Sequence, residues 1–494
     1  MIDPKKFQDF WKANGLRSSQ ELFADCVTEH GPPLYRSKKT QSPQRLNEPF
    51  WCDYLANERI LFFEAPEDRY YVYNSDNGKY EIVSPQVLKA RLSDLIEIAD
   101  SQWSGCQEIK KLNSDSNRRS VIELLRGKVE QRNFFAVRPV AIHCQNTMVS
   151  FKNGQIQPKP FSPEFRSRNQ SPICYDPKAT YKEFSKAFFE RMPEYDVSLL
   201  QKYYGQCLLG RNLSQTLILL DGIPYSSKTT LARVIGELVG ENSFTELRTS
   251  QLEERFETSA FIGKTLLMAA DVKANFLSRY GASVIKRLVG TDLMSAEFKR
   301  ANARVTFEGA FNVVVTSNSR LRAKLEGDNN AWARRILIVR FEHPFEGERV
   351  ADYHRVIVEK EGSGILNFAI AGVSNLLSDM KQRGKIDIAP QQEARVRKFV
   401  DESDSLRMFV RSNLCSTSDK TCDVTINEIL DGYFEHCVDN DLNSLPTKEA
   451  RKDLEEIMRE LFGRSRSNSV LREGKSRPGF PLIKWRAEDD EDGQ

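Results

Sequence analysis

A single segment constrains the fold of this 494-residue chain more than any other. The apolar run Thr216–Leu220 leads into Asp221, and a helical pattern that opens on Lys228 continues to Gly240. A strand, a turn and a helix that begins with Lys-Thr form the context in which a phosphate-binding loop occurs. Backbone N–H groups of such a loop, together with the helix N-terminus, hold phosphate oxygens. We therefore expect nucleotide binding by Gly222, Ile223, Pro224, Tyr225, Ser226, Ser227, Lys228, Thr229 and Thr230.

Two side chains of this loop have a definite chemical role. We expect Lys228 to bridge the β- and γ-phosphates of ATP and the Thr229 hydroxyl to bind Mg²⁺. The loop departs from the usual pattern G-x-x-x-x-G-K-[ST] at Ser227, where glycine is expected. A side chain at that position restricts the φ and ψ angles that the loop backbone can adopt. A strand, turn and helix that bind no nucleotide are the alternative.

Two later strands end in polar residues that suit the same site. Leu266–Ala270 is followed by Asp271, a carboxylate that we expect to contact Mg²⁺ through water. Phe311–Thr316 leads to Asn318, which we expect to orient the attacking water or to sense the γ-phosphate. Each residue also has an ordinary interpretation, because acids and asparagines are common in turns. The general base remains unassigned.

An arginine pair, Arg334 and Arg335, precedes the apolar run Ile336–Arg340. An arginine presented to the ATP of a neighbouring subunit can act as an arginine finger, which by analogy with GTPases is worth about 10³–10⁵ in rate. We expect one of the two to act in this way, which would complete a catalytic set with Lys228, Asp271 and Asn318. A surface or salt-bridged pair is the alternative.

The pattern of elements predicts three domains. Residues 179–390 alternate short apolar strands with helices, which indicates an α/β domain with a parallel sheet. Residues 1–178 contain aromatic-rich strands, hairpin turns and a helix near 85–98, and we expect an α+β accessory domain. Residues 391–487 begin with a charged connector, 391–404, and continue with three helices and a two-stranded ribbon of Val470–Leu471 and Pro481–Trp485, the pattern of a winged helix. Residues 488–494 form an acidic tail.

Composition excludes several classes of protein. With 72 Lys and Arg against 69 Asp and Glu, the net charge is only +3, and 40% of the residues are hydrophobic, as in ordinary globular proteins. No apolar run reaches the roughly 18 residues of a membrane helix, and no signal peptide is visible at the N-terminus. We expect no membrane association and a cytoplasmic location. The nine cysteines form no C-x-x-C pair and the five histidines are scattered, so we expect no zinc site.

Residues 216–344 resemble the AAA+ motor of superfamily three DNA helicases, in particular the phage, plasmid and poxvirus-type primase-helicase group. The resemblance rests on the phosphate loop, Arg255–Lys264, Gly281–Lys286, the Asp271 strand and Phe311–Asn318. It implies ATP and Mg²⁺ as cofactors, DNA as partner (single-stranded, forked or origin duplex), a homo-hexameric ring and contacts with replication proteins of the host or element. Two departures stand: Ser227, and the single acid Asp271 where many relatives carry two adjacent acids.

DNA contacts are predicted at two places. The stretch Met294–Glu308 reads as a hairpin with Lys299, Arg300 and Arg304 at its tip, which in this family points into the central channel and holds the DNA backbone. An exposed turn without DNA is the alternative. On the expected winged helix, a second basic cluster comprises Arg464, Arg466, Arg472, Lys475 and Arg477. A contact of that wing with another subunit is the alternative.

These observations favour an ATP-dependent DNA helicase that serves the replication of a phage, plasmid or integrated mobile element. The alternative from another class is a nucleotide-switched origin-binding or remodelling ATPase that does not unwind DNA. A small-molecule phosphotransferase would need an acceptor pocket that the sequence does not reveal. We expect no primase activity, because residues 1–178 show no clustered acids and histidine for two catalytic metals.

Overall fold

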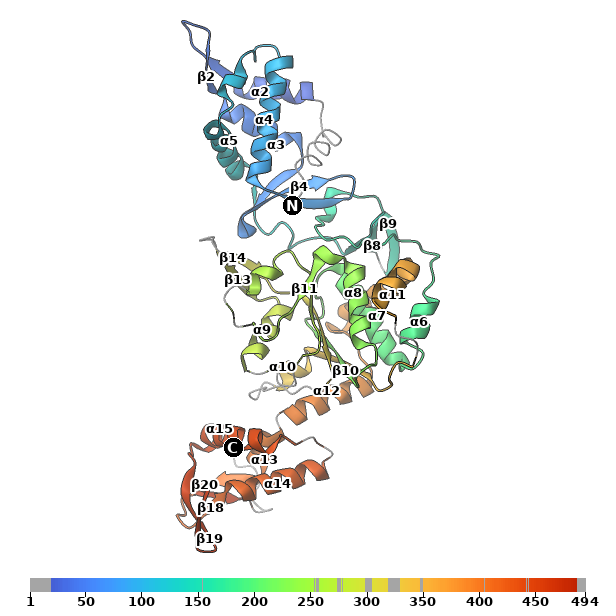
Figure 1. The fold of residues 1–494 in the computed structure, drawn as a ribbon, viewed down its shortest axis with the longest axis vertical. Coiled ribbons are helices and arrows are strands. Elements are labelled where there is room, and N and C mark those ends of the chain that lie inside the picture. Colours follow the sequence, from blue (N-terminus) through green and yellow to red (C-terminus); the bar gives the residue numbers. More distant parts are fainter. Residues whose placement is uncertain are drawn as a thin grey trace.

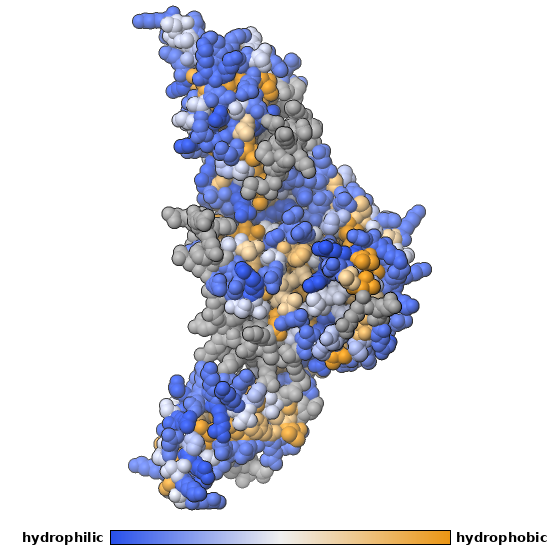
Figure 2. Space-filling model, in the orientation of Figure 1, coloured by the Kyte–Doolittle hydropathy of each residue, from blue (hydrophilic) through white to orange (hydrophobic). Residues whose placement is uncertain are grey.

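The computed structural model describes residues 19–486 except 153, 253, 255–256, 273–276, 278, 298–303, 319–328, 347–349, 404, 441 and 443. The molecule is elongated, and three units follow one another along its longest axis (Figure 1). We call them the N-terminal unit (19–140), the central unit (141–403) and the C-terminal unit (405–486). The surface of the molecule is mostly hydrophilic, with apolar patches on each unit (Figure 2). Within these described ranges, no helix combines the length and apolarity that a bilayer span requires.

In the N-terminal unit, helices share a core with one face of a sheet of order β5-β4-β3-β6. Phe63 and Tyr70 face the helices, whereas Phe62 and Tyr71 face the opposite side and contact Phe134 or Phe135. This alternation follows from the period of two along a strand. The elements are α2 (Ser19–His30), β1 (Leu34–Arg36), β2 (Pro43–Leu46), α3 (Glu48–Glu58), β3 (Leu61–Glu64), β4 (Arg69–Asn74), β5 (Lys79–Val83), α4 (Pro85–Gln102), α5 (Asp115–Lys128) and β6 (Glu130–Gln131).

The central unit contains a five-stranded sheet of order β11-β12-β15-β10-β16, and every strand pair in it is parallel. Both faces are covered, since alternate residues of β10 enter two different cores. Continuous apolar strands are expected of such a sheet. Its strands are β10 (Leu217–Gly222), β11 (Phe244–Glu246), β12 (Leu266–Ala269), β15 (Asn312–Ser317) and β16 (Ile336–Phe341). The other elements of this unit are β7 (Ala141–His143), β8 (Met148–Lys152), β9 (Gln155–Lys159), α6 (Lys182–Phe188), α7 (Glu194–Leu209), α8 (Lys228–Val239), α9 (Arg279–Val289), β13 (Leu293–Glu297), β14 (Arg304–Glu308), α10 (Asn329–Ala333), α11 (Tyr353–Arg383) and α12 (Pro390–Ser403).

Glycines allow the long helix α11 to lie against its neighbours at backbone distance. A Cβ on Gly372 would lie 2.0 Å from the Gln201 carbonyl oxygen of α7, and one on Gly364 would lie 2.0 Å from that of Thr180. Helix α11 is kinked at Glu361, where φ is −125°. The Glu361 carboxylate accepts hydrogen bonds from the Glu183 and Phe184 N–H groups at 3.0 and 2.8 Å, so it caps α6.

Two segments that we expected to belong to flanking regions contribute to central cores. Strands β7 and β8 place Ile142 and Val149 against α7 and α11. The expected charged connector is instead helix α12, whose Val396, Phe399 and Val400 pack into the core on one face of the sheet. The three- and four-residue spacing of these apolar side chains explains the helix, because it places them on one side.

The C-terminal unit has three helices, α13 (Ser405–Asn413), α14 (Ile426–Asp439) and α15 (Thr447–Phe462), around one core. Its sheets have the orders β18-β20-β19 and β17-β21. Their strands are β17 (Leu414–Ser416), β18 (Asp423–Thr425), β19 (Ser467–Arg472), β20 (Lys475–Pro481) and β21 (Ile483–Trp485). Three helices are present, but the expected ribbon of Val470–Leu471 with Pro481–Trp485 is wrong, because β19 pairs with β20 and β21 pairs with β17.

The expected α/β class with a parallel sheet is confirmed. Each of the four predicted sheet strands is present within one or two residues of its expected bounds, as β10, β12, β15 and β16. The sequence did not reveal β11, a three-residue edge strand that pairs with β12 alone.

We predict that Gly372→Ala destabilises the central unit by about 1–3 kcal/mol, because the new methyl group overlaps the Gln201 carbonyl oxygen. Gly127→Ala is the matched control. Gly127 also lies in a helix, α5, but a Cβ there would have no neighbour within 4 Å, so we expect no loss and a gain of up to about 1 kcal/mol. Urea unfolding of both variants tests this, and equal effects would contradict the close approach of α7 and α11.

Candidate nucleotide site

The loop between β10 and α8 depends on a close backbone approach at its first residue. Gly222 has a φ of 144°, and a Cβ there would lie 2.1 Å from the Phe341 carbonyl oxygen of β16. The Ile223 N–H donates to that same oxygen at 3.2 Å. Glycine is therefore required at position 222 to let the loop start against β16.

Ser227 adopts the left-handed conformation for which the usual loop pattern supplies glycine. Its φ is 65° and its ψ is 13°, and it is the N-cap residue of α8 without a side-chain capping hydrogen bond. The first N–H groups of α8 therefore have no side-chain cap in the described part of the chain. Such N–H groups, at the positive end of a helix dipole, are suited to bind an anion.

The Lys228 ammonium is buried inside the loop, with the residue 3% exposed. It donates hydrogen bonds to the Gly222 carbonyl oxygen at 2.9 Å, to the Ile223 carbonyl oxygen, and to Ser226 Oγ at 3.0 Å. Burial lowers the pKa of Lys228, and the negative charges of Asp221 and Asp271 oppose that shift. The two carboxylates therefore partly compensate for the water that the ammonium loses on burial.

Asp271 and Asn318 meet at the ends of adjacent strands. The Asn318 Nδ2 donates to Asp271 Oδ1 at 2.7 Å, and the Asp271 N–H donates to Thr316 Oγ1 at 3.1 Å. Both residues are exposed, and Asp271 has a φ of 48°, a conformation that aspartate tolerates better than most residues. The structure therefore brings together a carboxylate and an amide that the sequence placed 47 residues apart.

Sheet topology explains why these residues converge. Strand β15 lies between β10 and β12, and all three are parallel, so their carboxyl ends share one edge. Ligands of open α/β sheets bind outside the carboxyl ends of the strands, because loops and helix N-termini gather there. Of the predicted catalytic residues, Lys228, Asp271 and Asn318 lie at this edge, as does Thr229 in the first turn of α8.

Arg334 and Arg335 lie at the opposite edge of the sheet, at the amino-terminal ends of its strands. The Leu217 N–H, at the start of β10, donates to the Arg335 carbonyl oxygen at 2.8 Å. That point is roughly 16 Å from Gly222 along the strand, from the rise per residue. Both arginines line a hollow beside α12, and the Arg335 Nη1 donates to the Ala331 carbonyl oxygen at 3.0 Å. Neither is placed to reach the phosphate loop of its own chain.

The predicted DNA contacts are only partly described. Lys299 and Arg300 lie outside the described residues, as does the acidic tail, and Arg304 is described only as the first residue of β14. In the C-terminal unit, Arg466 pairs with Glu455 at 3.0 Å. Arg464 has its Nε buried without a partner among the described atoms. Lys475 and Arg477 are exposed on β20.

Arg472 serves the fold of the C-terminal unit. It pairs with Glu428 and with Asp423, each at 2.6 Å, and hydrogen bonds to these carboxylates, to Glu428 above all, raise its pKa. Glu428 also completes the capping box of α14 with Thr425. The Arg472 charge therefore ties β19 to the start of α14 and is already neutralised within the chain.

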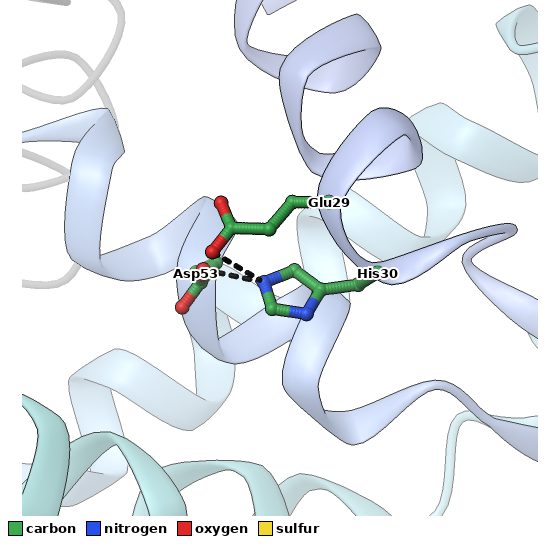
Figure 3. Close-up of side chains that lie close together, drawn as sticks. All are labelled: Glu29, His30 and Asp53. Atoms are coloured by element: carbon green, nitrogen blue, oxygen red, sulfur yellow. Dashed lines mark hydrogen bonds and ion pairs between the residues drawn. The ribbon is translucent and has the colours of Figure 1, made fainter.

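A cluster in the N-terminal unit corrects our expectation that no acids and histidine gather there. Glu29, His30 and Asp53 offer ligand atoms within 4.8 Å of one another (Figure 3). Helices α2 and α3 pack together, which joins residues far apart in the sequence. However, the Asp53 carboxylate already accepts from His30 Nε2 at 2.5 Å and pairs with Lys128. Hydrogen bonds from Lys128 and His30 outweigh the effect of burial and lower the pKa of Asp53.

The sequence did not identify Thr316 or the segment 341–345 as parts of this site. The Thr316 hydroxyl fixes the Asp271 backbone, and the Phe345 N–H donates to the Tyr225 carbonyl oxygen at 2.8 Å. Only the strand order shows that β16 is adjacent to β10 and delivers the segment after it to the phosphate loop.

Part of this chain matches a known protein family. Residues 220–335 match the family DUF5906, described as a family of unknown function. Among solved structures, the chain is similar to an A-form apo structure of the NrS-1 C-terminal region, with 12% identity, a TM-score of 0.40, and coverage of 85% of this chain and 96% of that chain. A second apo structure of that region gives 11% identity, a TM-score of 0.39, and coverage of 86% and 96%. No curated protein matches this chain in sequence.

We predict that Ser227→Val weakens nucleotide binding at least tenfold, because a β-branched side chain is disfavoured at the positive φ that this position requires. Ser227→Gly, which adopts that conformation freely, should bind at least as tightly as the natural protein. Titration calorimetry with Mg²⁺–ATP distinguishes the two variants. Equal affinities would mean that the loop does not use the left-handed conformation when it binds.

Proposed function

We propose that this chain is an ATP-dependent DNA helicase with an AAA+ motor, active in the replication of a phage, plasmid or mobile element. The observation that carries the nucleotide part of the proposal is the shared edge of the sheet. Lys228 begins α8, whereas Asp271 and Asn318 follow β12 and β15, and parallel pairing brings the carboxyl ends of β10, β12 and β15 together. A strand–turn–helix that binds no nucleotide would not require polar residues at the ends of β12 and β15.

The residues present fit a nucleoside triphosphate with Mg²⁺. The uncapped N-terminus of α8 offers N–H donors, and Gly222 leaves the loop free of a side chain beside β16. Lys228, Thr229 and Asp271 are the residues that would hold the phosphates and the metal. Bound Mg²⁺ would neutralise charge on the phosphate oxygens during phosphoryl transfer. Asn318 would position the water, and its hydrogen bond to Asp271 fixes the orientation of both side chains.

The location of the arginine pair supports a ring. Arg334 and Arg335 lie at the edge opposite to the phosphate loop, so a catalytic arginine from this pair must serve another subunit. That arrangement agrees with the homo-hexamer implied by the family resemblance. It also gives a reason for cooperation between subunits, since each nucleotide site would lack the arginine that its neighbour supplies.

Coupling to DNA is proposed from two features. Strands β13 and β14 form the expected antiparallel pair, with Glu297 opposite Arg304 at the end of the pairing. Lys299 and Arg300, which we predict at the tip, stand between these two residues in the sequence and lie outside the described residues. In the C-terminal unit, the helices and ribbon support a winged helix with Lys475 and Arg477 available to phosphates. The switch ATPase that remodels DNA without unwinding stays the second candidate, because both features would serve it as well.

We predict that Lys228→Ala lowers ATP hydrolysis at least about a hundredfold, because it removes the buried cation that stabilises charge in the transition state. Lys264→Ala is the matched control. Lys264 is also a partly buried lysine of the central unit, but it precedes β12 and so lies at the opposite edge of the sheet. Phosphate release measured for the three proteins tests the site. Hydrolysis by Lys228→Ala at the natural rate would refute the proposed function.

Strand displacement separates a helicase from a switch. We predict that neutralising Lys299, Arg300 and Arg304 together abolishes the unwinding of forked DNA but leaves ATP hydrolysis without DNA unchanged. The hairpin would contact the DNA backbone and not the nucleotide. Each lost phosphate contact to single-stranded DNA should reduce the log–log salt slope of binding by about 0.7. Unwinding at the natural rate by this variant would favour the switch interpretation.

A further inference from the structure

Strands β1 and β2 form a small antiparallel ribbon with a local excess of positive charge. We call residues 31–47, which contain both strands and the turn between them, the distal ribbon. This segment has four basic residues and no aspartate or glutamate: Arg36, Lys38, Lys39 and Arg45. The whole chain has nearly equal numbers of basic and acidic residues, so the distal ribbon departs clearly from the average. A cluster of charges of one sign attracts a partner of the opposite sign.

The distal ribbon lies at the tip of the N-terminal unit, at the opposite end of the molecule from the C-terminal unit (Figure 1). Its strands form a sheet of their own. Leu34 and Leu46 are paired across the ribbon and belong to the core that the helices share. Tyr35 and Arg45 form the next pair and are exposed, with the guanidinium 5.0 Å from the centre of the ring. One face therefore anchors the ribbon, and the other face is open to a partner.

Hydrogen bonds fix the turn of the distal ribbon. The Ser37 Oγ accepts from the N–H groups of Lys39 and Thr40, each at 3.3 Å. The Arg36 guanidinium donates to the Gln107 carbonyl oxygen at 2.7 Å, which joins the base of the turn to the chain after α4. The turn is therefore held in place before a partner arrives, which reduces the entropy that binding costs.

The fold leaves most of this positive charge without a counter-charge. Lys38, Lys39 and Arg45 are exposed, and none of them pairs with a carboxylate in the part of the chain that the structure describes. Lys111 of the same unit differs from them, because it pairs with Glu108. Three positive charges of the distal ribbon thus remain for a ligand outside the chain.

Shape and charge together favour duplex DNA as that ligand. The major groove of B-DNA is about 12 Å wide and admits a two-stranded ribbon, and phosphates line both of its sides. A membrane surface would select exposed apolar side chains as well as basic ones, whereas Leu34 and Leu46 are buried. An acidic protein segment would match the charge but would not need a ribbon that protrudes.

We propose that the distal ribbon is a DNA-binding site of the N-terminal unit, which enters the major groove and contacts phosphates through Lys38, Lys39 and Arg45. Tyr35 holds the Arg45 guanidinium on the exposed face. The choice of DNA among polyanions rests on the proposed function, but the site itself needs neither ATP nor the phosphate loop. Because phosphates carry no sequence information, the site binds duplexes of different sequence alike.

Charge neutralisation tests this site in the full chain, without nucleotide. We expect the triple variant Lys38→Gln, Lys39→Gln, Arg45→Gln to bind a short DNA duplex about tenfold more weakly, with a salt slope reduced by up to about 0.9 for each lost contact. The triple variant Lys38→Arg, Lys39→Arg, Arg45→Lys keeps the charges and should bind as the natural protein does. Fluorescence anisotropy at several salt concentrations measures both effects. The loss for single-stranded DNA should be smaller, because a single strand has no groove.

The matched control neutralises three exposed lysines of the central unit, Lys152→Gln, Lys159→Gln and Lys178→Gln. It changes the net charge of the chain by the same amount, and we expect it to leave duplex affinity within about twofold of the natural value. ATP hydrolysis without DNA should be the same in all of these proteins, because the distal ribbon is remote from the phosphate loop (Figure 1).

Several results would overturn the inference. Natural duplex affinity in the neutralised variant would do so and would leave the proposed function intact, as would an equal loss in the central-unit control. Weak binding by the charge-conserving variant would mean that the charges do not make the contact. If neutralisation removes binding to phosphatidylserine vesicles and not to DNA, the partner is a membrane surface. If the natural protein binds neither duplex nor single-stranded DNA, the proposed function is wrong as well.

Discussion

The contact between β10 and β16 at Gly222 is the constraint on which the rest of the site depends. Phe341 offers a carbonyl oxygen that the Ile223 N–H binds, and the approach is so close that no Cβ fits at residue 222. This contact fixes where the phosphate loop begins. It also fixes where the segment after β16 runs, because Phe345 pairs with Tyr225 a few residues later. One backbone contact thereby positions both the phosphate loop and the segment after β16 that runs beside it.

The opposite side of the loop depends on sheet order. Because β15 lies beside β12, Asn318 reaches Asp271, and the charge of Asp271 acts on Lys228. The same parallel direction that gathers these groups sends Arg334 and Arg335 to the other edge. Parallel topology therefore divides the predicted catalytic residues into two groups. Lys228, Asp271 and Asn318 lie at the carboxyl ends of the strands, and Arg334 and Arg335 lie at the opposite ends, away from the phosphate loop of their own chain.

Local sequence was sufficient for four of the five strands of the parallel sheet and for the polar residues at their carboxyl ends. Strong apolar runs predicted β10, β12, β15 and β16. Asp271 and Asn318, the polar residues that follow β12 and β15, were predicted to belong to the site. It was insufficient where long-range pairing decides. The cluster of Glu29, His30 and Asp53 depends on how α2 packs against α3, and the role of Arg472 depends on Asp423 and Glu428 across the sheet. Neither contact leaves a pattern along the chain. Helix α12 was missed for another reason: its many charges obscured three apolar residues at helical spacing.

The kink at Glu361 has a consequence for motion. The carboxylate at the bend of α11 is also the cap of α6, so α11 cannot straighten there without removing the acceptor from two N–H groups. Phe188 lies at the end of α6 and Tyr353 at the start of α11. Phe188 and Tyr353 should therefore move together, as one rigid body, in any hinge movement of the central unit.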